Sequence, residues 1–179
     1  MKISAKTFEI ASAIAMLVDS KDDGSSYREH IDSVRTEIKN TDPKVKLSSG
    51  MYRTAAVFKD FVVKFARDNR HEALKQEAEF IAKMRKNRKW GRHFPETHVL
   101  EVGGVTVLIQ EKVDMSHRGR RDLQDAAEHL ATRLGLDDMH EGNYGWKGPK
   151  GKEYPVFVDV DFRWNAEIPK ARKRRSWEV

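Results

Sequence analysis

The sequence contains no cysteine. This excludes a disulfide framework, a thiolate nucleophile and a cysteine-ligated zinc site, and it fits a reducing compartment. Long apolar runs are also lacking, because no stretch approaches the roughly 20 apolar residues that span a bilayer. The apolar segment 10–18 runs into charged residues at 19–23 rather than into a small-residue cleavage site, which favours a helix over a signal peptide. We therefore expect a cytoplasmic protein without a membrane segment.

The chain has 179 residues, of which 39% are hydrophobic and 35% charged, so one globular core with a short helical appendage is expected. The formal net charge of +6 favours anionic partners. Much of this excess lies in a basic tail, residues 169–179, which contains Lys170, Arg172, Lys173, Arg174 and Arg175. We interpret this tail as a solvated segment that also allows weak nucleic-acid contact.

Residues 1–44 predict two helices. Apolar residues recur at helical spacing up to Val18, and a turn follows at residues 22–24. Ser26 and Glu29 have the spacing of a capping box, which predicts the start of a second helix. Asp42 and Pro43 end it.

From residue 45 the pattern changes to short strands. The expected strands are 45–48, 53–58, 61–66, 99–102 and 105–113, and Gly103-Gly104 is typical of a two-residue hairpin turn. A helix over 71–87 packs on this antiparallel five-stranded sheet. Residues 45–115 thus form one α+β lobe, and residues 116–168, with a helix over 122–134 and a strand over 156–160, form a second.

The segment after that last helix carries the most specific chemistry. Asp138 and Asn143 have the D-x-x-x-x-N spacing of a kinase catalytic loop, in which the aspartate orients the acceptor hydroxyl and the asparagine binds Mg²⁺. A second oxygen ligand follows at Asp159, which ends the apolar run 156–158. Asp161 is its alternative, because Asp161-Phe162-Arg163 is closer to the letters D-F-G.

Lys64 lies inside the apolar strand 61–66, where an ammonium group needs a partner. The next helix offers Glu77 and Glu79. Glu77 is favoured because Ile81 and Met84 then fall at inward positions of the helix.

With these residues the chain resembles the eukaryotic-like protein kinase superfamily, in particular small phage-encoded kinases such as the early kinase of T7-like phages. Its Asp-x-His-x-x-Asn loop is also similar to that of aminoglycoside and choline kinases. The resemblance covers roughly residues 45–162. It implies a minimal kinase-like fold with a truncated, mostly helical second lobe, ATP and Mg²⁺ as cofactors, and the cytoplasm of a host cell as the location.

The resemblance also implies residue roles. Lys64 and Glu77 would form the phosphate-gripping pair, Asp138 would be the catalytic aspartate, and Asn143 with Asp159 (or Asp161) would hold the metal. The phosphate-covering loop would be Ser48, Ser49 and Gly50, and the adenine-binding hinge would lie at 110–112, with Glu111 in it and Ile109 near the gatekeeper position.

The sequence departs from the kinase pattern in two respects, and these leave alternative functions open. The loop at 48–53 has a single glycine, and only residues 163–179 follow Phe162, too few for an activation segment. A serine/threonine kinase acting on a protein or on itself is favoured. The alternatives are a pseudokinase that binds a host protein or a nucleic-acid machine, and a small-molecule kinase. The N-terminal helices or a second subunit, in a homodimer, would replace the missing lobe.

Overall fold

The computed structural model describes residues 3–20, 26–50, 52–67, 71–116, 121–137 and 140–162, with the side chains of 137, 161 and 162 excepted. Asp138 and the basic tail at 169–179 lie outside the described residues. The chain divides into two compact units, Met1–Val113 and Asp114–Val179. The N-terminal helices and the five-stranded sheet therefore belong to the same unit.

Two helices open the first unit. Helix α1 spans Ala5–Asp19, and the hydroxyl of Ser4 caps it by accepting a hydrogen bond from the Thr7 amide at 3.1 Å. Helix α2 spans Tyr27–Thr41. The capping box predicted at its start is confirmed, because the Glu29 amide donates to Ser26 Oγ and the Ser26 amide donates to Glu29 Oε2 at 3.0 Å.

The predicted antiparallel sheet of five strands is confirmed, and with the helices it makes this unit α+β. Its strand order is β1-β2-β3-β5-β4, formed by Lys46–Ser49, Arg53–Val57, Phe61–Ala66, Val105–Glu111 and Thr97–Val102. The β4–β5 hairpin turns at Gly103 and Gly104, whose φ angles of 60° and 94° fall in the left-handed region that glycine adopts without a Cβ clash.

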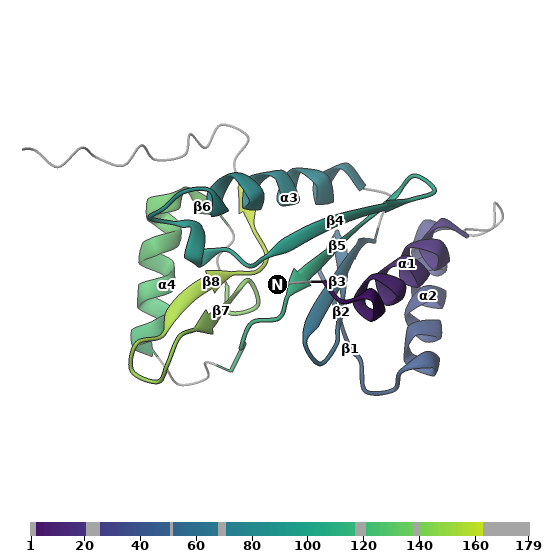
Figure 1. The fold of residues 1–179 in the computed structure, drawn as a ribbon, viewed down its shortest axis with the longest axis horizontal. Helices are drawn as coiled ribbons and strands as arrows, with labels where there is room; N and C mark the ends of the chain where they lie inside the picture. The colour runs from purple at the N-terminus through teal and green to yellow at the C-terminus, as the bar shows by residue number, and fades with distance from the viewer. Residues whose placement is uncertain are drawn as a thin grey trace, which may run out of the picture. The chain divides into compact units, whose positions relative to one another are not determined.

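Helices cover both faces of this sheet (Figure 1), as the hydrophobic clusters show. Helix α3 spans His71–Arg85 and a 3-10 turn, η1, follows at Gly91–His93. Side chains of a strand alternate between faces. Phe61, Val63 and Phe65 pack with α1 and α2, whereas Ala66 of the same strand packs with α3. Lys64, which alternates with Val63 and Phe65, therefore lies on the α3 face.

The second unit contains helix α4 at Arg121–Leu134 and two small antiparallel sheets. One pairs β6, Leu136–Asp137, with β9, Asp161–Phe162; the other pairs β7, Tyr144–Lys147, with β8, Tyr154–Phe157. The described part of this unit is therefore not mostly helical, contrary to expectation. Of the strand expected over 156–160, only 156–157 are in a strand, the end of β8. The chain bends after Phe157, where the amides of Val158 and Asp159 both donate to the carbonyl of Asn143.

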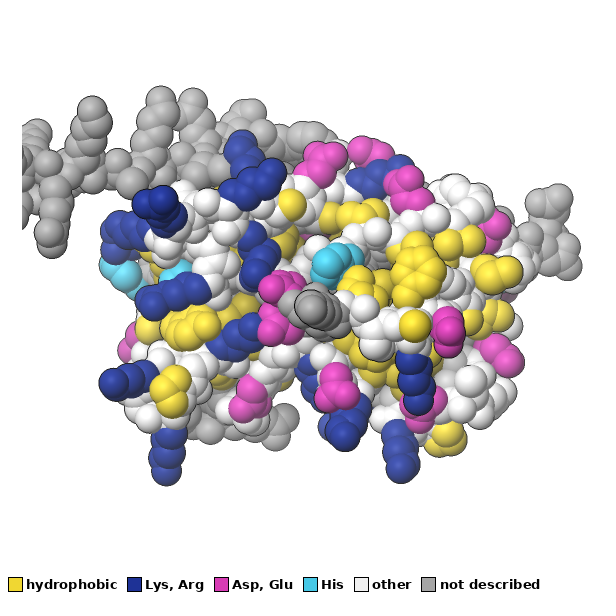
Figure 2. All heavy atoms as spheres, viewed as in Figure 1, with side chains coloured by type: hydrophobic (Ala, Val, Ile, Leu, Met, Phe, Trp, Pro, Cys, Tyr) yellow, Lys and Arg dark blue, Asp and Glu magenta, His cyan; other side chains and the backbone are white. Residues whose placement is uncertain are grey.

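Among the described residues, no helix is long and apolar enough to cross a membrane. In Figure 2, hydrophobic side chains of the first unit gather at the surface where α1 lies. Phe8 and Met16 of α1 are 50% and 62% exposed.

Candidate functional site

The ion pair predicted between Lys64 and Glu77 is present. Lys64 Nζ lies 2.7 Å from Glu77 Oε1, and the two residues are 5% and 1% exposed. Glu79, the alternative partner two residues later, is exposed. Because an unpaired charge is unfavourable in such an environment, the pair joins the centre of β3 to α3 with little freedom for either side chain.

A second cation reaches the same carboxylate. Arg53 Nη1 lies 2.6 Å from Glu77 Oε2, so the two oxygens of Glu77 are divided between Arg53 and Lys64. Register explains this arrangement: Arg53 pairs with Ala66, and Lys64 pairs with Ala55, so both cations point to the α3 face. Sequence reasoning missed Arg53, because an arginine at the first position of a strand carries no signal of burial.

The residues predicted to cover the phosphates lie at the end of β1 and at the start of the turn to β2. The Gly50 amide donates to the Arg53 carbonyl at 2.9 Å, and Ser49 Oγ lies 3.4 Å from the hydroxyl of Thr54. Arg67, directly after β3, holds the turn from outside: its guanidinium donates to the Gly50 carbonyl at 3.0 Å. Ser48 and Ser49 are the last residues of β1.

The predicted hinge lies at the end of β5. The amide of Glu111 donates to the carbonyl of Glu96 at 2.8 Å, and the Gln110 side chain donates to Thr97 Oγ1 at 3.3 Å. Ile109 is buried in the cluster formed with α1 and α2, so it does not share the face of Lys64. On β5 that face belongs to Leu108, the register partner of Lys64.

The second unit brings together the two residues expected to hold metal. Asn143 is 6% exposed, and its carbonyl accepts the amides of Val158 at 2.9 Å and Asp159 at 3.1 Å. Asp159 thus lies in the bend directly after β8, next to Asn143, and its Oδ1 is buried. Asp161 lies in the separate strand β9, paired with Asp137 of β6.

His140 has a structural role in the loop before β7. Its Nδ1 accepts a hydrogen bond from the Gly142 amide at 3.1 Å, and its carbonyl accepts the Asn143 amide at 2.9 Å. These bonds fix the loop that leads into β7.

Asn143 and Asp159 are neighbours through the main chain, and their side chains are one amide and one carboxylate. These are oxygen ligands of the type that Mg²⁺ takes together with phosphate oxygens and water. Groups of three or more His, Asp or Glu side chains that could hold a metal ion do not occur in the part of the chain that the structure describes.

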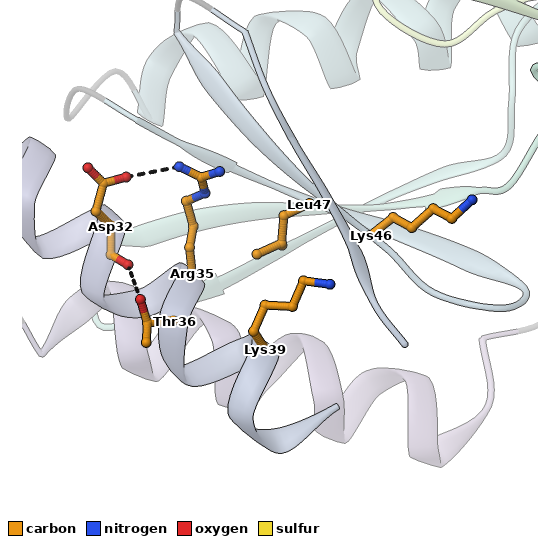
Figure 3. A pocket seen from close by; sticks show the side chains of 6 residues that line it. All are labelled: Asp32, Arg35, Thr36, Lys39, Lys46 and Leu47. Carbon is orange, nitrogen blue, oxygen red and sulfur yellow. Dashed lines mark hydrogen bonds and ion pairs between the residues drawn. The ribbon is translucent and has the colours of Figure 1, made fainter. Parts of the chain in front are cut away.

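A separate hollow of about 650 Å³ lies between α2 and β1 (Figure 3). Two of its basic side chains have partners in the fold. Arg35 pairs with Asp32 of the same helix at 3.0 Å. Lys39 donates to the carbonyls of Pro43 and Val45 and so ties the end of α2 to the segment that leads into β1.

Comparisons of the chain with protein-family models, curated proteins and solved structures give no match.

Proposed function

We propose that the chain is an ATP- and Mg²⁺-dependent phosphotransferase of minimal kinase-like fold, acting on a protein serine or threonine or on itself. The observation that carries the proposal is the buried Lys64–Glu77 pair, 2.7 Å long, between the central strand of a five-stranded sheet and the helix that follows it. In the proposed function, a lysine held in this way would interact with the phosphates of the nucleotide.

The contacts at Asn143 support the same proposal. An asparagine five residues after an aspartate, in contact through its carbonyl with a second aspartate after the next hairpin, gives the oxygen ligands that a nucleotide-bound magnesium ion needs. Asn143 and Asp159 would hold the ion. When bound, Mg²⁺ would neutralise charge on the phosphate oxygens.

In the proposed reaction, an acceptor hydroxyl oxygen forms a bond to the γ-phosphorus of ATP, and the bond from that phosphorus to the bridging oxygen breaks, which releases ADP. Asp138 orients the hydroxyl and receives its proton. Lys64, held by Glu77, stabilises negative charge on the phosphates. The protein contributes position and electrostatics, and no covalent intermediate is required.

The test is incubation of the full chain with labelled ATP and Mg²⁺, followed by detection of phosphate on the chain itself and on an added protein substrate. Asp138→Ala should abolish the labelling, whereas Asp137→Ala, its neighbour, should retain most of it. Absence of labelled protein with the wild type, or equal labelling with Asp138→Ala, would refute the proposal. Binding of ATP without transfer would instead favour a pseudokinase.

A further inference from the structure

Arg53 is bonded to two different parts of the first unit. Its main-chain carbonyl accepts the Gly50 amide at 2.9 Å and so closes the turn between β1 and β2. Its side chain donates to Glu77 Oε2 on α3 at 2.6 Å. One residue thus links the turn to the helix, and it does so through the carboxylate that also holds Lys64.

Both oxygens of the Glu77 carboxylate are held by cations. With Oε2 occupied by Arg53, the carboxylate is held from two sides, and Oε1 faces Lys64 Nζ. A carboxylate held by only one cation can rotate about its terminal torsion, which is a broad one. Removal of Arg53 should therefore loosen Glu77 and, with it, Lys64.

We propose that Arg53 is a positioning residue for Lys64 and that it couples the turn at 49–53 to α3. The inference rests on the proposed function, in which the phosphates of ATP are the ligand of Lys64. Phosphate bound at the turn would restrain the main chain of Arg53, the guanidinium would restrain Glu77, and Glu77 would hold Lys64 at the phosphates. This link supplies rigidity to a turn that has only one glycine.

Arg85 provides a matched control, because it is also an arginine of this unit that pairs with a glutamate. Its Nη2 lies 3.2 Å from Glu96 Oε1, and its Nη1 donates to the carbonyl of Phe94 at 2.7 Å. Arg85→Gln therefore removes an arginine–glutamate pair without touching Glu77.

The first experiment measures kcat and KM for ATP in the full chain. Arg53→Gln should lower kcat/KM by about 10- to 100-fold, the scale of a misplaced catalytic group, and Arg53→Lys should restore part of it. Arg85→Gln should change it less than about twofold, as expected for a surface pair. Because Arg53 acts through Glu77, the variant Arg53→Gln in a Glu77→Gln background should be no slower than Glu77→Gln alone. The inference would be overturned if the double variant lost kcat/KM by the product of the two single losses, or if Arg85→Gln lost as much as Arg53→Gln.

The second experiment needs no activity and also covers the case in which Glu77→Gln does not fold. Amide hydrogen exchange is compared in wild type, Arg53→Gln and Arg85→Gln. Arg53→Gln should speed exchange both in the turn at 49–53 and in the middle of α3. Arg85→Gln should affect the C-terminal end of α3 and residues 94–96, to which Arg85 is bonded, but not the middle of α3. Unchanged exchange in the middle of α3 would overturn the inference. If the wild type transfers no phosphate, the proposed function fails. The hydrogen-exchange comparison then tests by itself whether Arg53 couples the turn to α3.

Discussion

Replacing Glu77 by glutamine tests the centre of the first unit. Glu77 is 1% exposed and receives Lys64 at 2.7 Å and Arg53 at 2.6 Å. The neutral amide keeps the size of the side chain but removes the charge that compensates both cations. The amide also has only one acceptor oxygen, so its NH₂ group would face either Lys64 or Arg53, which are both donors. The substitution therefore isolates electrostatic and hydrogen-bonding effects from packing.

The expected loss follows from burial. Removing one partner of a buried ion pair destabilises a protein by about 3–5 kcal/mol, because the other charge stays buried and uncompensated. Lys64 is the more deeply buried of the two cations: its side chain is 6% exposed, whereas that of Arg53 is 20% exposed. Such a loss is a large part of the roughly 5–15 kcal/mol that holds a typical domain folded.

The assay is urea unfolding of the full chain followed by far-UV circular dichroism, with Glu79→Gln as the matched variant. Glu79 is exposed and lies two residues along the same helix, so its replacement should change the free energy of unfolding by less than about 0.5 kcal/mol. Equal effects of the two substitutions, or a loss below about 1 kcal/mol for Glu77→Gln, would refute the reasoning.

Three further predictions concern stability, each measured as the urea midpoint. His71 accepts the Thr106 amide on Nδ1 and contacts the Tyr27 hydroxyl at 3.2 Å, and burial lowers its pKa below the ordinary value of about 6.5. The neutral form is therefore favoured in the fold, so its contribution is present above that value and lost as pH falls. Wild type should lose more stability between pH 7.5 and 5.5 than His71→Gln, and parallel losses would contradict this. A Cβ at Gly91 would overlap the carbonyl oxygen of Arg85, so Gly91→Ala should destabilise by about 1–3 kcal/mol, whereas a Cβ at Gly50 would lie 3.8 Å from the carbonyl oxygen of Arg53, so Gly50→Ala should be tolerated. Ser26→Ala removes the capping box of α2 and should cost about 1 kcal/mol; no change would show that the cap is dispensable.

The Lys64–Glu77 pair could be predicted because the sequence constrains it twice. An ammonium group inside an apolar strand needs a carboxylate, and the helical spacing of Ile81 and Met84 selects Glu77 over Glu79. The sheet was predictable for a similar reason, since its strands are bounded by clear turn residues such as Gly103 and Gly104.

Arg53 and Ile109 show what the sequence does not contain. The face on which Arg53 lies depends on its register with Ala66, a partner thirteen residues away in the chain that no local pattern reveals. Strand β5 is buried on both faces, so its apolar run has no alternation from which to read that Ile109 points to α1 and α2. For both residues, the strand register determines the face of the sheet on which the side chain lies.

The second unit was harder to predict because its strands are short. Tyr144–Lys147 includes Gly145 and is followed by Gly148 and Gly151, and these glycines give the segment the composition of a loop. The bend at Val158 and Asp159 depends on one carbonyl, that of Asn143, which accepts both amides. Such a bond cannot be inferred from spacing.

The affinity for ATP with and without Mg²⁺, measured by titration calorimetry on the full chain, tests the central claim most directly. Wild type should bind ATP more tightly with Mg²⁺. Asp159→Asn should lose this difference, and Asp161→Asn should keep it, because Asp159 adjoins Asn143 whereas Asp161 is paired in β9. Absence of ATP binding in the presence of Mg²⁺, or loss of the magnesium dependence in Asp161→Asn alone, would contradict the account.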